Sequence, residues 1–78
     1  MHITGREFKA LVALKKSADG FSEIKDGLIW KGVLVSNAKP RSWSNPEWRA
    51  VLGSLTKKGF YRPADGDFGL VKYGETGA

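Results

Sequence analysis

The side chains with the clearest capacity for chemistry lie between residues 39 and 57, where cations accompany an amide, an aromatic ring and two small residues. Arginine can bind a guanine edge through two hydrogen bonds, and lysine and arginine both bind phosphate. The amide of Asn45 can hydrogen-bond to an adenine edge or to phosphate. This stretch is therefore a candidate nucleic-acid-binding surface, with the residues Lys39, Arg41, Trp43, Asn45, Arg49, Ala50, Gly53 and Lys57.

Constellations for catalysis or metal binding are absent from the sequence. The chain has no cysteine and a single histidine, His2, so it cannot supply a metal site of His and Cys ligands. Asp65 and Asp67 flank Gly66 in a stretch with turn composition and without a neighbouring base, so they do not form a catalytic pair. There is no Ser/His/Asp set and no glycine-rich phosphate loop. The sequence predicts a binding protein that is not an enzyme and needs no cofactor or metal.

The positive charge is concentrated in the middle of the chain. The 78 residues include 13 Lys or Arg and 8 Asp or Glu, for a net charge of +5. Residues 37–62 carry six basic residues against one acidic residue, whereas residues 63–78 carry one basic residue against three acidic ones. A local excess of this kind predicts a polyanionic partner. The alternative is a solvated basic face that only keeps the protein soluble.

A helix over residues 44–57 positions most of the candidate residues. Ser44–Glu47 has the sequence of a capping box, with a proline suited to the first helical turn. Lys57 and Lys58 suit the C-terminal end of a helix, and Gly59 can adopt the left-handed conformation that ends it. The apolar residues recur at helical spacing and predict one buried stripe of Trp48, Val51, Leu52 and Leu55. The opposite face then carries Pro46, Arg49, Ala50, Gly53 and Lys57.

Two candidate residues have a functional and a structural interpretation. A glycine in an exposed helix interior costs about 1 kcal/mol relative to alanine, so Gly53 indicates the close approach of another backbone, from nucleic acid or from protein. Alternatively, Gly53 packs against the hairpin that follows or against a neighbouring helix. Trp43 either caps the core or stacks on a partner. Beside it, Lys39 and Arg41 are placed to hold a phosphate at the helix N-terminus.

A β-hairpin follows the helix directly. Residues 60–62 and 70–73 are β-prone runs, and residues 63–67 between them have turn composition with an Asp-Gly step. The segment Leu52–Tyr61 resembles the end of the third helix and the first wing strand of winged helix-turn-helix DNA-binding proteins. This resemblance, over residues 44–73, implies an α+β fold with a three-helix core and a C-terminal two-stranded wing. It also implies a transcription regulator that binds double-stranded DNA through the third helix.

The tip of the expected wing does not suit phosphate. Asp65 and Asp67 at this tip would repel a DNA backbone, so the wing points away from DNA or the partner is a protein. Winged helices that bind only protein share the same pattern of leucine, Lys-Lys-Gly and hairpin. The alternative function is therefore a protein-binding adaptor or inhibitor that uses the third-helix face and the acidic wing.

The N-terminal half predicts a first helix, and the resemblance implies a second one. Thr4–Glu7 is another capping box, with Ile3 placed to form a hydrophobic staple with Phe8. The helix is expected to end at Asp19–Gly20 and to bury Phe8, Leu11, Val12 and Ala18. The resemblance implies a further helix between Ser22 and Val35, although the residues at 25–27 equally predict a hairpin turn. Residues 36–43 are expected to form a loop.

The length of the chain predicts one domain over residues 1–74 and a frayed tail over residues 75–78. No signal peptide or membrane span is recognisable, so we expect a cytoplasmic protein without a membrane partner. A domain this small needs a partner protein or a homodimer to cover a long DNA site.

Overall fold

The two long helices begin where their capping boxes predict, in a computed structural model that describes residues 2–18 and 21–76. In α1 (Gly5–Ser17), the Thr4 hydroxyl accepts a hydrogen bond from the Glu7 N–H at 3.1 Å, and the Glu7 carboxylate accepts one from the Thr4 N–H at 2.7 Å. Ser44 and Glu47 make the same reciprocal pair at the start of α3 (Asn45–Lys57). Both predicted capping boxes are confirmed.

The stripe predicted for α3 is buried, and Gly59 has the expected positive φ of 82° beyond its C-terminus. The stripe predicted for α1 is wrong in part. Phe8 and Val12 are 58% and 38% exposed, and the helix instead buries Ala10, Leu11 and Leu14. The helix is turned so that Glu7 faces inward, where it binds side chains of α3. Ala18 packs against the core as expected, and the predicted end at residues 19–20 lies outside the described residues.

A β-hairpin occupies the segment where the second helix was expected, so that prediction is wrong. It consists of β1 (Ser22–Lys25) and β2 (Leu28–Leu34). Asp26 and Gly27 connect the strands with φ values of 54° and 76°, the left-handed pair that a tight hairpin turn requires. The alternative hairpin turn at residues 25–27 is therefore confirmed. A helix of one turn, α2 (Val35–Ala38), follows within the segment predicted as a loop.

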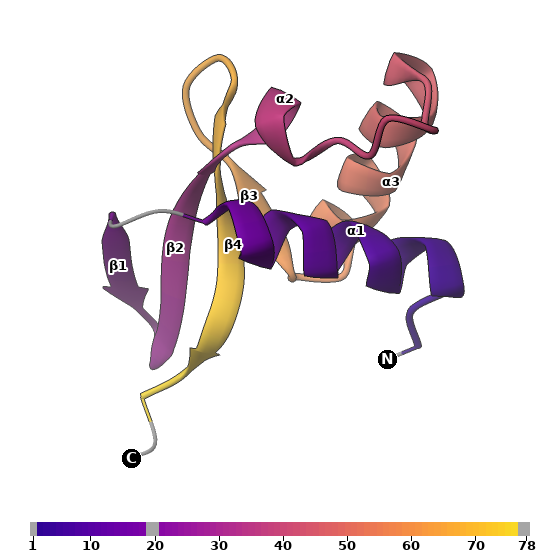
Figure 1. The fold of residues 1–78 in the computed structure, drawn as a ribbon. Coiled ribbons are helices and arrows are strands. Elements are labelled where there is room, and N and C mark those ends of the chain that lie inside the picture. The colour runs from indigo at the N-terminus through magenta and orange to yellow at the C-terminus, as the bar shows by residue number, and fades with distance from the viewer. Residues whose placement is uncertain (1, 19–20, 77–78) are drawn as a thin grey trace.

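The second hairpin, β3 (Tyr61–Pro63) and β4 (Phe68–Glu75), joins the first in one antiparallel sheet with the order β1-β2-β4-β3 (Figure 1). The sheet therefore has four strands, not the two strands of the expected wing. The described chain is a small α+β domain with three helices. No helix in this described part is both long and apolar enough to cross a membrane.

The sheet also includes the start of the expected tail. Glu75 belongs to β4, and the Thr76 N–H donates a hydrogen bond to the Gly27 carbonyl at 2.9 Å. Residues 75 and 76 are thus held by the β1–β2 turn, which corrects the predicted boundary. Residues 77 and 78 lie outside the described part.

The core lies between the helices and one face of the sheet. Val71 on β4 and Tyr61 opposite it on β3 belong to this core, together with Leu14 of α1 and Leu55 of α3. Neighbouring residues in a strand point to opposite faces, so Leu70 lies on the other side of the sheet, where it is also buried. Trp30 is buried apart from the main core, with the Arg62 guanidinium 5.0 Å from its ring.

The buried carboxylate of Glu7 ties α1 to α3. It accepts hydrogen bonds from the Lys58 ammonium at 2.6 Å and from the Ser54 hydroxyl. The hydrogen bond from Lys58, followed by those from Ser54 and the Thr4 backbone, lowers the pKa of Glu7 from its ordinary 4.5 to about 2. Glu7 is therefore charged at neutral pH and holds α1 in the orientation that exposes Phe8.

Candidate functional site

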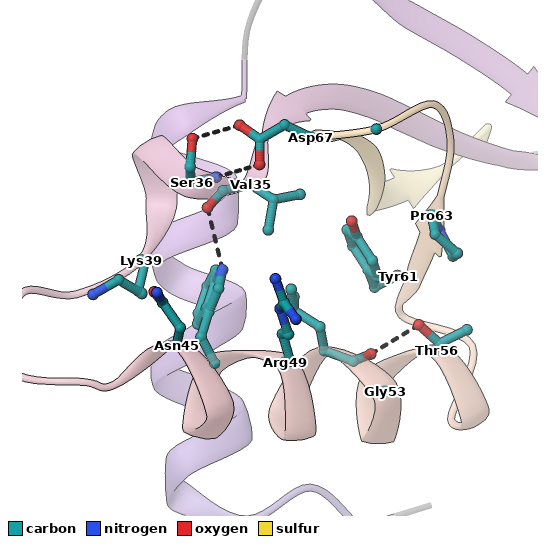
Figure 2. A pocket seen from close by; sticks show the side chains of 13 residues that line it. Val35, Ser36, Lys39, Asn45, Arg49, Gly53, Thr56, Tyr61, Pro63 and Asp67 are labelled. Atoms are coloured by element: carbon teal, nitrogen blue, oxygen red, sulfur yellow. Dashed lines mark hydrogen bonds between the residues drawn. The ribbon is translucent and has the colours of Figure 1, made fainter.

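A groove of about 530 Å³ lies between α3, α2 and the loop that joins β3 to β4 (Figure 2). Its floor is apolar and its rim is polar. Three of the predicted site residues on α3 line this groove, and Lys39 lines it at the end of α2. Its lining residues are Val35, Ser36, Lys39, Asn45, Trp48, Arg49, Leu52, Gly53, Thr56, Tyr61, Pro63, Gly66 and Asp67.

The β3–β4 loop is fixed to the start of α2. Asp67 accepts hydrogen bonds from the Ser36 N–H at 3.0 Å and from the Ser36 hydroxyl, and its own carbonyl accepts one from the Val35 N–H at 2.8 Å (Figure 2). The residue before α2 is Leu34, whose side chain cannot cap a helix. Asp67 supplies the missing cap from another element, so one of the two loop carboxylates has a structural role.

The floor of the groove is built from two aromatic residues. The Trp48 indole N–H donates a hydrogen bond to the Val35 carbonyl at 3.2 Å, which anchors α2 on α3. Tyr61 lies against Gly69, where an added Cβ would be 2.0 Å from the Tyr61 oxygen, so any larger residue at this position requires the Tyr61 ring to move. Burial, and secondarily the charge of Asp67, raises the pKa of Tyr61 above its ordinary value of 10.

The exposed face of α3 carries the predicted row of small and polar residues. Asn45, Arg49, Gly53 and Lys57 recur every four residues, and all four are exposed. Figure 2 shows Asn45 and Arg49 projecting from α3 toward the groove. Apart from the adjacent residues and the backbone of α3 itself, no atom of residues 2–18 and 21–76 lies within 4 Å of a Cβ added to Gly53. The interpretation that Gly53 packs against the hairpin or a neighbouring helix is therefore wrong, and Ala50 beside it is also exposed.

The segment before α3 contains two candidate residues that support the fold. Trp43 is half-buried against the core, with its ring edge-on to Trp48 at 5.8 Å between centroids, so its interpretation as a core cap is confirmed. The Lys39 ammonium donates hydrogen bonds to the carbonyls of Trp43 at 2.7 Å and Pro40 at 3.3 Å, which closes the loop. Arg41 is exposed. Of the two residues expected to hold a phosphate, Lys39 is therefore hydrogen-bonded to backbone carbonyls and Arg41 faces solvent.

The basic residues of the middle segment divide into paired and unpaired groups. Lys58 forms an ion pair with Glu7 at 2.6 Å, and Arg62 forms one with Glu23 at 2.9 Å. Within residues 2–18 and 21–76, no ion pair involves the remaining exposed cations of this segment, which are Arg41, Arg49 and Lys57. These three cations lie on α3 or in the loop that leads into it.

Sequence reasoning missed the roles of Asp67 and Tyr61 in this site. The signal for Asp67 was its residue type, because aspartate is a preferred helix cap, but its partner is 31 residues away in sequence.

In the described part of the chain, no cluster of His, Asp and Glu side chains is arranged to hold a metal ion. Comparisons with protein-family models, with curated proteins and with solved structures found no match for this chain.

Proposed function

We propose that this protein is a small winged-helix regulator that binds double-stranded DNA through the exposed face of α3. In this interpretation α3 enters the major groove, and the β3–β4 hairpin is the wing beside it. Arg49 and Lys57 bind phosphate or base edges, Arg41 binds phosphate near the N-terminus of α3, and Asn45 contacts a base edge or phosphate. The protein acts by binding and not by catalysis.

The observation that carries this proposal is the combination of unpaired cations with an open helix face. Arg49 and Lys57 flank Gly53, where nothing in the described chain crowds the helix surface. Lys58 and Arg62 form ion pairs with acidic residues of the same chain, and neither belongs to this row. A face with free cations and small residues suits the close approach of a DNA backbone.

The order of elements supports the winged-helix interpretation despite the two additional strands, β1 and β2. The chain runs α1, β1, β2, α2, α3, β3 and β4, and β4 lies between β2 and β3 in the sheet. In this arrangement β1 is an extra edge strand paired only with β2. α2 has a single turn, and residues 39–44 separate it from α3. With this order of elements, α3 and the β3–β4 hairpin are neighbours, as the third helix and the wing are in the proposed fold.

The alternative remains a protein-binding adaptor or inhibitor that uses the same α3 face with an acidic wing. The hydrogen bonds of Asp67 to Ser36 work against this alternative. With Asp67 engaged in the fold, Asp65 is the remaining free carboxylate at the tip, which leaves little acidic surface for a basic partner.

The test is a fluorescence-anisotropy titration of the full chain with random-sequence duplex DNA at two salt concentrations. If Arg41, Arg49 and Lys57 each neutralise a phosphate, the slope of log K against log salt is about −2.7. Affinity should then fall roughly 40-fold between 50 and 200 mM salt. A duplex affinity that does not change with salt, or no binding at low salt, contradicts the proposal.

A matched pair of variants locates the interface. Arg49→Ala should weaken DNA binding, because this exposed cation forms no ion pair within the described residues and lies on the open face. Lys9→Ala removes the same charge from an exposed position on α1 and should leave DNA affinity close to that of the wild type. Equal losses for both variants would indicate a diffuse charge effect instead of a defined α3 surface.

A further inference from the structure

A second groove, of about 230 Å³, lies between α1 and the C-terminal half of β4. It shares no lining residue with the groove beside α3. The proposed DNA contacts therefore leave it unoccupied. Its lining residues are Leu11, Lys15, Phe60, Lys72, Tyr73, Gly74 and Glu75.

One wall of this groove is a free strand edge. β3 pairs with β4 only over Gly69–Val71, and the last hydrogen bond on that side joins the Lys72 N–H to the Phe60 carbonyl at 2.9 Å. β4 then continues through Tyr73–Glu75, and Figure 1 shows this end of the strand extending past α1. No strand of the described chain pairs with β4 on this side beyond Val71. An exposed edge of this kind can pair with an added extended segment.

The opposite wall of the groove has an exposed apolar flank. Phe8, Val12 and Lys15 recur at i, i+4 and i+7, so they share one side of α1. This is the side of Lys15, which lines the groove. Phe8 is 58% exposed, and Tyr73 on the strand side is 44% exposed. Tyr73 lines the groove and Phe8 lies on the side of α1 that carries Lys15, and exposed large apolar side chains of this kind suit a protein partner better than a nucleic acid.

Lys15 and Lys72 line the groove, a third lysine, Lys31, lies beside Tyr73 on β2, and each of the three has its ammonium near an aromatic ring. Lys31 and Lys15 lie 4.6 and 5.9 Å from the centroid of the Tyr73 ring, and Lys72 lies 5.5 Å from that of Phe60. Within the described residues none of the three forms an ion pair, and Glu75 is the one acidic residue in the lining. The groove lining therefore carries two lysines against one carboxylate, a net positive charge.

We propose that this groove binds an extended, acidic segment of a partner protein that also carries large apolar side chains. The backbone of the segment pairs with the free edge of β4, its apolar residues contact Phe8, Val12 and Tyr73, and its carboxylates face the lysines. A second copy of this chain is a poor occupant, because a symmetric contact would place the same lysines against one another. The protein would then join DNA on one surface to an acidic partner on another.

The experiment is a selection of random linear peptides displayed on phage against the full-length chain. Enriched peptides should combine Asp or Glu with large apolar residues. In ¹⁵N-labelled protein they should shift the amide signals of Leu11, Phe60, Tyr73 and Gly74, and leave those of Asn45 and Arg49 unchanged. Duplex DNA should not displace them, and their binding does not depend on whether the chain binds DNA.

Charge-reversal variants provide the matched control. Lys15→Glu with Lys31→Glu should weaken the selected peptides by tenfold or more, whereas Lys25→Glu, at an exposed position of β1 that does not line the groove, should have an effect of less than twofold. Far-UV circular dichroism checks that both variants fold. If the variant with Lys15→Glu and Lys31→Glu does not fold, the amide signals that the peptides shift in the wild-type protein identify the binding surface.

The proposal is overturned if no peptide is enriched, if the enriched peptides are basic, or if their signal shifts map to α3. It is also overturned if phosphatidylserine vesicles, and not peptides, shift the groove signals, because the surface would then bind anionic lipid.

Discussion

The carboxylate of Asp67 caps the backbone of Ser36, with 3.0 Å between the Ser36 nitrogen and the carboxylate oxygen. α2 has only one turn and no side-chain cap of its own, so this contact from the β3–β4 loop completes it. Because the same contact fixes the loop, one pair of residues sets the width of the groove beside α3.

Replacing Asp67 by alanine should therefore cost about 1 kcal/mol of stability, the usual cost of losing a helix cap. In a domain of this size the thermal midpoint should fall by about 4–8 °C. Asp65→Ala is the control, because no hydrogen bond of the Asp65 side chain occurs among the described residues and its backbone carbonyl remains. Calorimetry of both variants measures the two thermal midpoints. Equal midpoints for Asp67→Ala and Asp65→Ala would contradict a structural role for Asp67.

Gly53 tests the open face of α3. Gly53→Ala should raise the free energy of unfolding by about 0.5–1 kcal/mol, because alanine favours a helix and its Cβ would meet no other side chain or element of the described residues within 4 Å. Gly53→Glu should also leave the fold intact but abolish DNA binding, because it adds bulk and negative charge to the face. Anisotropy titrations and urea unfolding separate the two effects. Wild-type DNA affinity in the glutamate variant would rule out α3 as the reading element.

Lys39 and Arg41 should behave differently although they are two residues apart. Arg41→Ala should weaken binding to all duplexes alike and reduce the salt slope by about 1, with the thermal midpoint unchanged. Lys39→Ala should lower the thermal midpoint, because its ammonium holds the Trp43 and Pro40 carbonyls. Thermal unfolding and salt titrations of both variants make the comparison. A Lys39 variant as stable as the wild type would indicate that these carbonyl contacts contribute nothing.

Acid should weaken the fold through Glu7. Its folded pKa of about 2 lies below the ordinary 4.5, so its contribution to stability is complete above pH 4.5 and is lost as the pH falls toward 2. The urea midpoint of the wild type should fall across that window. Glu7→Gln should be less stable at neutral pH and should show a smaller further loss in acid.

Glu75→Gln is the control for this acid effect, because Glu75 is exposed. It should retain the pH dependence of the wild type. The pKa of Glu47 is also lowered, first by hydrogen bonds from Ser44, so some acid sensitivity should remain without Glu7. A wild-type pH profile in the Glu7 variant would contradict the assigned role.

Local signals in the sequence were sufficient for much of this fold. The Ser44 capping box, the stripe from Trp48 to Leu55 and Gly59 each depend on neighbours within one or two helical turns, and all three were predicted correctly. The exposed row on α3 follows from the same periodicity, so the face with Arg49 and Gly53 was also predictable.

The remaining features depend on contacts that are distant in the sequence. Residues 28–34 form a strand because they pair with β4, some 40 residues later, which periodicity cannot reveal. The face of α1 was misassigned because Glu7 is buried by Ser54 and Lys58, and a charged residue in a helix is ordinarily assigned to the surface. Asp67 was likewise interpreted as an exposed charge at the wing tip and not as a helix cap, because its partner Ser36 is distant in the sequence.

The strand order has a consequence for protein synthesis. β2 and β4 form the centre of the sheet, so the first hairpin lacks its main partner until residues 68–75 have left the ribosome. Before then β2 presents an unpaired edge and Val33 has no strand beside it. The domain should therefore fold only after translation of β4, and a nascent chain stalled before Phe68 should be open to proteases and to aggregation.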